Sequence, residues 1–449
     1  MKNYVKTAVV CLLVLITSLL VSLVYFNHKV DVRNAQALPF SSDYAMTAQP
    51  ITTTEPPETR PTVPTTAKPK PLPTEKAVID IDSMTIIDIY PLSLAGGDWD
   101  VKHCQGVAVD MKNGYIYFSY TTMLVKIDWN GKIIGSVTGI KGHLGDITYN
   151  ESDGKVYCGY IPNGKKAFYA AIFNVDKITK SGMKPTKDIM RTVSLNEVYK
   201  DYSVDYDGDG KVENTRTSPD HRYGCAGVDG VCFGPSFSGE NGKKKLLTVG
   251  YGIYHNWTRQ DNDYQVLVQY DVTGWWDKYG QPYSAKEFHH VGPDNHNGKY
   301  FVHTGNTNAG VQTLEYFDEL NLWFLNCYRG HKGEYKPFTL FIVDGDVKPT
   351  KQTLKGQPKT DRQNVLSLYQ DGVHDSKNDI YGWYSDYGVQ GMAYIGNGLF
   401  YIAQPYKNWT GKIAAMCYLY VWNPSRKIPF QISVDIGNDY SISKKPRVD

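Results

Sequence analysis

Gln105-Gly106-Val107-Ala108-Val109 is the first of five stretches that follow one pattern: a polar residue or glycine, a small residue, then residues expected to be buried, small and buried. The other four are Gly145-Asp146-Ile147-Thr148-Tyr149, Asp229-Gly230-Val231-Cys232-Phe233, Gln312-Thr313-Leu314-Glu315-Tyr316 and Gln390-Gly391-Met392-Ala393-Tyr394. Each is followed by two more runs of β-strand composition, and the last run ends at a turn residue. Those turn residues are Asp128, Asp176, Asp271, Asp344 and Asn423. Two marks that recur in the same order indicate five copies of one structural unit.

The folded part is predicted to be all-β, because most apolar runs are short, rich in Tyr, Val, Ile and Phe, and bounded by Gly, Asn, Asp or Pro. Repeated antiparallel units pack around an axis, so we expect a β-propeller of five blades with four antiparallel strands each. The long intervals between later repeats leave six or seven blades as an alternative. Residues 84–89 form a predicted outer strand that closes the ring in the last blade, together with residues 430–434.

The N-terminal part has a different composition. Residues 7–26 form an uncharged apolar run long enough to cross a bilayer as a helix, and Lys2 and Lys6 place residues 1–6 in the cytoplasm. We expect an uncleaved signal anchor, with a cleaved signal peptide as the alternative. Residues 27–78 are rich in Thr and Pro and predict a disordered stalk. Residues 79–449 are then an extracellular domain, tethered to the cell membrane in a single pass or, in the alternative, secreted.

Charge and cysteine content exclude several classes of function. The net charge of +2 and the absence of basic blocks argue against nucleic acid as a partner. The sequence contains no Cys-x-x-Cys pair, so it gives no support for a zinc site or a thioredoxin-like site. The cysteines beyond the apolar run can form disulfides in an oxidising compartment or remain buried thiols, and both alternatives stay open. They are Cys104, Cys158, Cys225, Cys232, Cys327 and Cys417.

The repeat predicts where a site lies. In a propeller the innermost strands all begin at one rim of a central channel, so the first residues of the five repeats converge there. These residues are Gln105, Gly145, Asp229, Gln312 and Gln390, with Asp146 one position later. The glutamines are candidate ligand-binding residues. Asp146 and Asp229 are a candidate pair of catalytic carboxylates. The alternative is that the side chains of the ring only form hydrogen bonds with one another and with water.

Histidines accompany the same repeats. His103 and His143 each precede the first repeat residue by two positions, and His221 and His303 lie upstream of later repeats. Imidazole at a channel mouth can act as a general acid or base or bind a transition metal. His103 and His143 are therefore candidate catalytic residues, and the alternative is that they hydrogen-bond the loops between blades.

One acidic segment predicts a calcium site. Asp205, Asp207, Asp209, Lys211 and Glu213 occupy alternate positions around Gly208 and Gly210, which matches the first nine places of an EF-hand-type loop. Arg216 replaces the bidentate glutamate at place twelve, so Asp201 or Asp220 would complete the coordination from outside the loop. We expect a structural Ca²⁺ there, against the alternative of a solvated acidic turn.

Aromatic residues are frequent, with 35 Tyr and nine Trp. Several lie in loop-like sequence, including Trp257 and Trp409. Exposed aromatic rings suit carbohydrate binding and protein interfaces equally. The sequence lacks a Gly-x-Ser-x-Gly elbow, a phosphate-binding glycine loop and a His-Glu-x-x-His helix, so serine-hydrolase, nucleotide-fold and zincin functions are disfavoured.

The repeats over about residues 84–435 resemble those of β-propeller proteins. Gln105-Gly106, followed one blade later by Gly142-His143-Leu144-Gly145-Asp146, is similar to five-bladed glutaminyl cyclases and calcium-dependent apyrases. The resemblance implies a fold with polar residues around a channel. It assigns no catalytic residue, because no complete motif of either family is present.

Three functions remain. The first is a surface-tethered module that binds a glycan or protein at the channel mouth. The second is an extracellular hydrolase or lyase acting on a polysaccharide, a phosphate ester or a peptide end, with Asp146, Asp229, His103 and His143 as its catalytic residues. The third is a structural scaffold in which calcium only fixes a loop.

Overall fold

The computed structural model describes residues 90–432 except 241, 243, 386 and 425, and its β-strands form five blades. The predicted signal anchor, the stalk and the strand at residues 84–89 lie outside these residues. Within them, no helix has the length and apolar character needed to span a membrane.

The first two blades follow the chain in order. Blade 1 contains β2 (Cys104–Asp110), β3 (Tyr115–Tyr120), β4 (Met123–Asp128) and β5 (Ile133–Val137). Blade 2 contains β6 (His143–Asn150), β7 (Lys155–Ile161), β8 (Tyr169–Phe173) and β9 (Met190–Ser194). All neighbouring strands in both blades are antiparallel, as predicted.

Blades 3 and 4 exchange segments. Blade 3 contains β10 (Cys225–Gly234), β11 (Leu246–Ile253), β12 (Tyr264–Tyr270) and β14 (Gly298–His303). Blade 4 contains β15 (Asn308–Phe317), β16 (Leu322–Tyr328) and β17 (Leu340–Asp344), with bridges at Leu368 and Trp383 in place of a regular fourth strand. The hairpin of β18 (Thr350–Thr353) and β19 (Arg362–Leu366) leaves blade 4 and adds to β14, where the β14–β19 pairing is parallel. A second hairpin pairs β20 (Val373–Asp375) with β21 (Ile380–Gly382).

Blade 5 closes the ring with both ends of the described chain. It contains β22 (Met392–Gly396), β23 (Leu399–Lys407) and β24 (Ile413–Trp422), and β1 (Ser93–Trp99) pairs with β24 as the outer strand. β25 (Phe430–Ile432) also pairs with β24. The predicted type of closure is therefore present, but the described N-terminal strand is β1 rather than residues 84–89.

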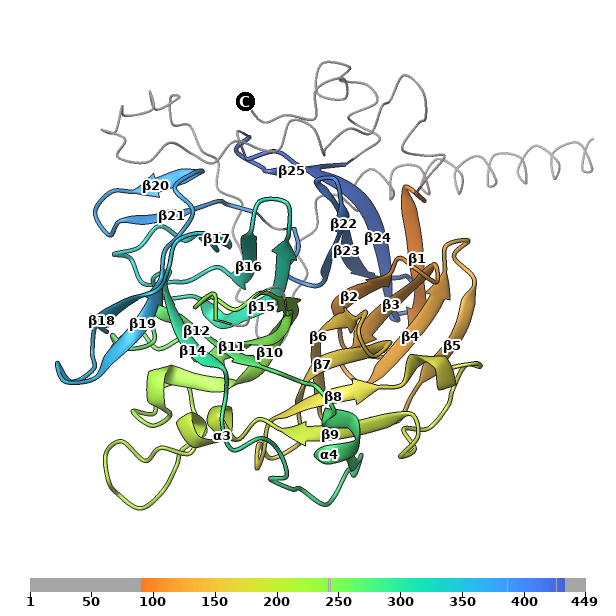
Figure 1. Cartoon of the computed structure of the whole chain (residues 1–449), viewed down its shortest axis with the longest axis horizontal. Helices are drawn as coiled ribbons and strands as arrows, with labels where there is room; N and C mark the ends of the chain where they lie inside the picture. Colours follow the sequence, from red (N-terminus) through yellow and green to blue (C-terminus); the bar gives the residue numbers. More distant parts are fainter. Residues whose placement is uncertain (1–89, 241, 243, 386, 425, 433–449) are drawn as a thin grey trace, which may run out of the picture. The chain divides into compact units, whose positions relative to one another are not determined.

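The inner strands β2, β6, β10, β15 and β22 form the centre of the fold, and each contacts the inner strands of its two neighbouring blades (Figure 1). This ring confirms five blades and makes the alternative of six or seven wrong. Glycine at the second position of the repeat allows neighbouring inner strands to approach closely. A Cβ on Gly106 would lie 2.6 Å from Ile147 N, and one on Gly391 would lie 2.9 Å from the carbonyl carbon of Gly106.

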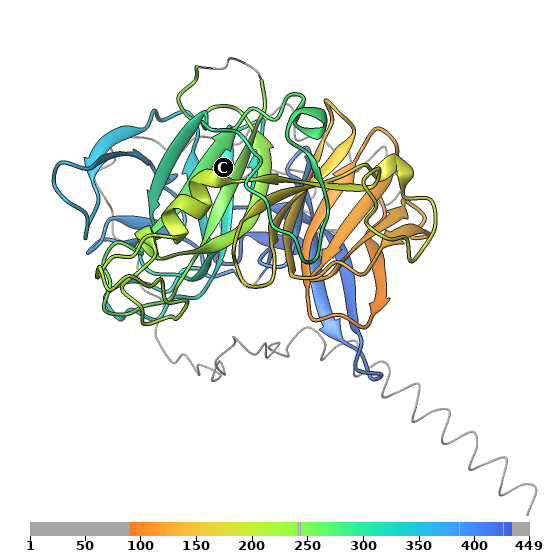
Figure 2. The same ribbon diagram turned by 90° about the horizontal axis from the view of Figure 1, so that it is seen from below.

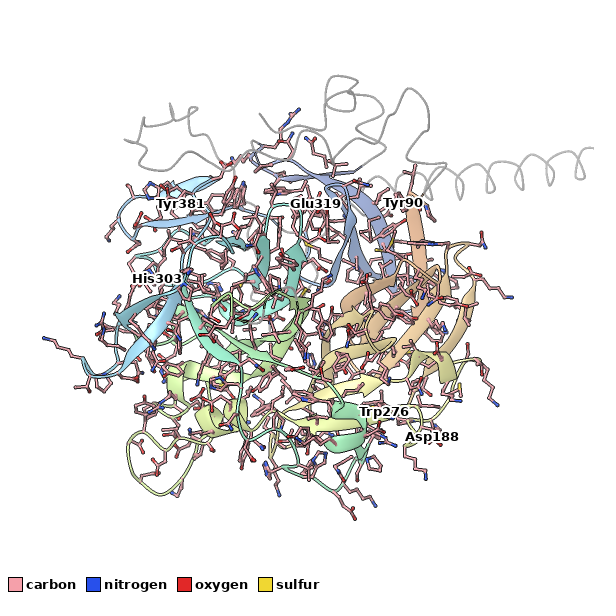
Figure 3. All side chains as sticks on the ribbon, viewed as in Figure 1. Tyr90, Asp188, Trp276, His303, Glu319 and Tyr381 are labelled. Atoms are coloured by element: carbon pink, nitrogen blue, oxygen red, sulfur yellow. The ribbon has the colours of Figure 1, made fainter. Side chains whose placement is uncertain are left out.

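A long insertion covers the outer edge of blade 2. Between β12 and β14 the chain forms α4 (Trp275–Lys278) and β13 (Gln281–Pro282), which pairs with β9. Arg191 of β9 packs over the Trp276 ring and donates to the Trp276 carbonyl (2.7 Å). Trp276 is labelled in Figure 3. The insertion thus protects a sheet edge.

The six cysteines of the described part are all buried and unpaired. Of the two alternatives from the sequence, buried thiols are the one observed. Cys158, Cys225, Cys232 and Cys327 pack among aliphatic and aromatic side chains of the core.

Candidate functional site at the channel mouth

All five inner strands begin on one side of the ring, here called the mouth face. In each blade, the loop that precedes the inner strand and the loop that joins the second strand to the third lie on this side, because successive strands are antiparallel. The loops are residues 100–103, 121–122, 139–142, 162–168, 203–221, 254–263, 304–307, 329–339, 383–391 and 408–412. Figure 2 shows the strands from the side, with the turn between β23 and β24 and α4 at opposite ends of the blades.

Three predicted residues from three blades meet at the mouth. His143 Nε2 lies 3.2 Å from Asp229 Oδ1, and Gln312 Nε2 donates to Asp229 Oδ2 (3.3 Å). The exposed fractions of the His143 and Asp229 side chains are 35% and 14%. These three residues are called the mouth cluster, and their carboxylate, imidazole and amide groups can all bond a polar ligand.

Other predicted ring residues lie beside the cluster. Gln390 Nε2 donates to the hydroxyl of Tyr328 (3.5 Å). Gln105 is half-buried, and Gly145 has no side chain to contribute. The backbone N–H of His103 donates to Thr121 Oγ1 (3.2 Å), so this loop residue is held against the turn between β3 and β4.

Asp146 lies inside the ring rather than at its mouth. Its side chain is buried, and Oδ2 accepts hydrogen bonds from the backbone N–H groups of Val231 (3.2 Å) and Leu314 (3.0 Å). Burial raises its pKa well above the usual value, although these hydrogen bonds oppose the shift. A residue with 1% of its surface exposed has no access to a substrate, so this placement argues against the predicted carboxylate pair.

Glu315, at the fourth position of its repeat, is a second acidic side chain of an inner strand that accepts hydrogen bonds. Its Oε1 accepts from Tyr316 N (2.9 Å) and from the Cys232 thiol (3.4 Å). Burial raises the pKa of Glu315 to about 7. Buried backbone N–H groups need an acceptor; Asp146 supplies one to Val231 and Leu314, and Glu315 supplies one to Tyr316.

Lys165 connects the mouth face of blade 2 to that of blade 3. Its ammonium donates to the Ala226 carbonyl (3.0 Å) and to the Tyr254 hydroxyl (3.0 Å), and it lies 3.5 Å from Asn214 Oδ1. Burial lowers the pKa of Lys165, and Asp229 partly opposes this effect. Lys165 thus adds a positive group beside the mouth cluster.

The acidic segment lies on the mouth face between α3 (Asn196–Tyr202) and β10. Carboxylate oxygens of Asp205, Asp207 and Asp209 lie within 4.8 Å of one another, and so do those of Asp207, Glu213 and Asp220. Lys211 donates its backbone N–H to Asp209 Oδ1 (2.8 Å), so its side chain is not required for the turn. Asp201, the other outside candidate, instead pairs with Lys299 and the Tyr251 hydroxyl.

Buried Asp220 holds the acidic segment in place. Its Oδ1 accepts from Tyr206 N (2.8 Å) and its Oδ2 from Glu213 N (2.9 Å). A hydrogen bond to Asp220 raises the pKa of the Glu213 carboxyl. Carboxylate oxygens gathered in this way are ligands of the type that Ca²⁺ prefers.

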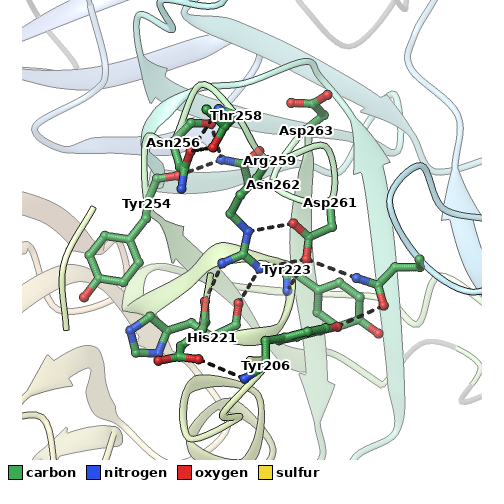
Figure 4. A network of polar contacts seen from close by, with 12 residues as sticks. Tyr206, His221, Tyr223, Tyr254, Asn256, Thr258, Arg259, Asp261, Asn262 and Asp263 are labelled. Carbon is green, nitrogen blue, oxygen red and sulfur yellow. Dashed lines mark hydrogen bonds and ion pairs between the residues drawn. The ribbon is translucent and has the colours of Figure 1, made fainter. Parts of the chain in front are cut away.

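Arg259 anchors this segment to the loop between β11 and β12 (Figure 4). Its guanidinium forms a bidentate pair with Asp261, with both distances 2.8 Å. It also donates to the backbone carbonyls of Asp220 and His221. The acidic segment and residues 254–263 are therefore one connected structure.

Sequence analysis missed Lys165, Arg259 and Glu315. Glu315 stands at a repeat position where the other repeats have a small residue. This exception to the pattern was the one signal in the sequence that the Glu315 side chain has a special environment. Lys165 and Arg259 lie in loops without repeat character, so only the folded arrangement reveals their partners.

Comparisons with known proteins give no family. No family model and no curated protein matches the chain. Among solved structures it is similar to one described as the Dos1 propeller, with 10% identity, a TM-score of 0.32, and coverage of 73% of this chain and 69% of the other. A protein of unknown function from Bacteroides caccae matches with 13% identity and a TM-score of 0.27 over 62% of this chain and 99% of the other. The assignment of the fold rests on the strand pairing described above.

Proposed function

We propose that this protein binds a glycan or protein ligand at the mouth face. The supporting observation is the mouth cluster, in which side chains from three blades meet around a partly exposed carboxylate. Such polar groups, placed by rigid strands, can fix the orientation of a ligand. Tethering to the cell surface through residues 7–26 belongs to the same proposal and would present the mouth face outside the cell.

Binding accounts for the arrangement better than hydrolysis by two carboxylates. Acid–base hydrolysis of a glycosidic bond requires both carboxyl groups to reach the bond. Asp229 is partly exposed, whereas Asp146 is occupied by backbone N–H groups inside the ring.

One observation supports an enzyme as the second candidate. The contact between His143 and Asp229 is of the kind in which a carboxylate orients an imidazole that acts as a general base. A hydrolase or lyase using His143 would therefore need Asp229 but not Asp146.

Binding and catalysis are separated by testing the full-length chain on a glycan array and on a panel of hydrolase and lyase substrates. We expect Asp229→Asn to weaken ligand binding about tenfold, the loss expected for one hydrogen bond to a charged group. Asp153→Asn, on the opposite face, is the matched control. If Asp229→Asn leaves binding and activity unchanged, the mouth cluster is not the ligand-binding site.

We also propose that the acidic segment binds a structural Ca²⁺ through Asp205, Asp207, Asp209, Glu213 and Asp220, with the carbonyl of Lys211. The clustering of these oxygens supports it. Because Arg259 joins this segment to residues 254–263, the ion would stiffen both loops of the mouth face.

Calcium should raise the thermal unfolding temperature of the full-length chain, since an ion that binds only the folded state stabilises it by about 2.7 kcal/mol at a hundred times Kd. We expect Asp207→Asn to remove this increase. Asp188→Asn is the control, because Asp188 lies at the edge of the molecule (Figure 3). An equal increase in both variants would contradict the assignment.

A further inference from the structure

The exposed aromatic residues of the described part of the chain lie on the mouth face, in or beside loops of blades 3, 4 and 5. Large exposed side chains on the opposite turns are aliphatic, such as Met111 and Val347. Single exposed apolar side chains are common on protein surfaces, so the informative feature is that the aromatic ones share one face. The exposed aromatic residues are Tyr206, Trp257, Tyr328, Tyr406 and Trp409.

Two of them belong to one sequence motif. Tyr-x-Asn-Trp-Thr occurs at residues 254–258 and again at residues 406–410. The first copy begins the loop between β11 and β12 of blade 3, and the second covers the end of β23 and the turn before β24 of blade 5. Both loops join the second strand of a blade to the third. The two copies therefore occupy equivalent places in the propeller.

Both copies of the motif have the same hydrogen bonds. Asn256 Oδ1 accepts from the backbone N–H (2.9 Å) and from the hydroxyl (2.8 Å) of Thr258. Asn408 Oδ1 accepts from the backbone N–H (3.0 Å) and from the hydroxyl (2.7 Å) of Thr410. The polar side chains of the motif thus bond each other within the turn, and the tryptophan between them is exposed in both copies.

The Trp257 side chain is held in one orientation, although 63% of it is exposed. Its indole N–H donates to His255 Nε2 (2.5 Å), and its ring lies at 21° to that of His331 in blade 4, with centroids 6.5 Å apart. Fully buried Asn262 donates to the Asn256 carbonyl (3.0 Å) and holds the backbone of the loop. A ring fixed in this way loses little conformational freedom when a ligand binds.

Trp409 stands at the tip of a hairpin that extends beyond the inner strand of blade 5. β22 pairs with residues 399–402 of β23, whereas the pairing of β23 with β24 continues through residue 407 (Figure 2). β1 pairs with the extended part of β24, and the Asn408 side chain donates to Asp98 Oδ2 of β1 (3.1 Å). Trp409, with 96% of its surface exposed, is therefore presented by a supported hairpin.

Blade 4 lies between the two copies of the motif (Figure 1). Tyr328, at the end of β16, is 36% exposed. Its hydroxyl accepts from Gln390, the first residue of the blade 5 repeat (3.5 Å). His331 in the following loop contacts the Trp257 ring of blade 3. The exposed aromatic residues therefore continue from blade 3 across blade 4 to blade 5.

The surroundings of these rings favour a carbohydrate as the ligand. Loops 254–263, 329–339 and 408–412 contain no large exposed aliphatic side chain. A membrane surface or an apolar protein interface would be matched by aliphatic groups around the rings. A sugar ring instead has an apolar face together with hydroxyl groups, which suit aromatic rings with amide and hydroxyl groups beside them.

We infer that Trp257 and Trp409 are two stacking platforms for one chain of an uncharged polysaccharide, which crosses blade 4 beside Tyr328. This inference rests on the proposed function and specifies its ligand class. Stacking requires a flat sugar face without axial hydroxyl groups, and contact with both platforms requires an extended chain. A β-1,4-linked glucan has both properties.

The test measures binding of the full-length chain to hydroxyethyl cellulose, which is a soluble β-1,4-glucan, to cellobiose and to dextran, which is an α-1,6-glucan. At equal concentrations of glucose units, we expect hydroxyethyl cellulose to bind at least about tenfold more tightly than cellobiose, because one polymer chain engages both platforms. Dextran lacks an extended flat ribbon of sugar rings and should bind no more tightly than cellobiose.

Trp257→Ala and Trp409→Ala should each lower the affinity for hydroxyethyl cellulose at least about tenfold, because losing either platform ends the simultaneous engagement of both. Trp409→Tyr should retain most of the binding, whereas Trp409→Leu should not, since leucine keeps apolar character without a ring. Met111→Ala removes a large exposed side chain from the opposite face and should bind like the unmodified chain. Circular dichroism and the unfolding temperature confirm that each variant is folded.

Equal binding of hydroxyethyl cellulose and dextran would overturn the inference. A loss of no more than about twofold in each alanine variant would show two independent sites and would also overturn it. Full binding by Trp409→Leu would indicate a general apolar contact in place of stacking. Normal binding in both alanine variants, with binding lost in Asp229→Asn, would keep the proposed function and reject this inference. The reverse result would support the platforms and reject the mouth cluster.

Discussion

Three acidic side chains of the repeats, at the first, second and fourth repeat positions, have different surroundings. Asp229 is partly exposed beside His143 and Gln312. Asp146 and Glu315 instead accept hydrogen bonds from backbone N–H groups of inner strands. The carboxyl group of Asp229 is thus available for a ligand, and those of Asp146 and Glu315 stabilise the ring.

Asp146→Ala should destabilise the fold by about 2–4 kcal/mol, because two buried N–H groups, on Val231 and Leu314, lose their acceptor. Asp146→Asn retains an acceptor oxygen and should cost less. Chemical denaturation of the three proteins provides the comparison. If both the alanine and the asparagine variant are as stable as the unmodified chain, Asp146 does not have this structural role.

Glu315 predicts a pH dependence of stability. Folding raises its pKa from 4.5 to about 7, so the folded chain binds this proton more tightly than the unfolded chain. Its contribution to stability is complete below pH 4.5 and is lost as the pH rises through about 7. Glu315→Gln should gain about 3 kcal/mol relative to the unmodified chain between pH 4 and pH 8. Parallel stability curves over this range would show that Glu315 does not titrate in this way.

Among the strands, the glycines of the repeat determine how closely neighbouring blades approach. A Cβ atom added to Gly106 would lie 2.6 Å from Ile147 N and 2.8 Å from Asp146 Oδ1. These contacts involve backbone and a buried side chain, which have little freedom to move.

Gly106→Ala should therefore cost about 1–3 kcal/mol through overpacking between blades 1 and 2. Gly333→Ala is the control, since a Cβ there meets nothing within 4 Å. Thermal unfolding measures both. If the two alanine variants unfold at the same temperature, close approach of the inner strands is not what selects glycine at position 106.

The repeat was sufficient to predict five inner strands and the meeting of Asp229 with Gln312, since equivalent positions of a radial repeat must converge. His143 joined them because it lies at the start of its inner strand. The burial of Asp146 could not be predicted, because its contacts come from Val231 and Leu314 in two other blades. The hairpin of β18 and β19 was missed since its parallel pairing with β14 joins segments that have no repeat character.

In the complete propeller, closure by β1 and the ring of inner strands create one mouth face. The mouth cluster, the acidic segment and the exposed aromatic residues all lie on it, although they come from separate parts of the chain. The opposite turns carry none of these features among the described residues. The propeller therefore predicts a single ligand-binding face.

Covalent footprinting of the full-length chain, with and without a saturating glycan identified by the array, tests this claim most directly. We expect protection of residues 203–221, 254–263 and 329–339, and no change in the opposite turns at residues 111–114 and 345–349. Protection of those opposite turns, with the mouth-face loops unchanged, would contradict a binding site at the mouth of the channel.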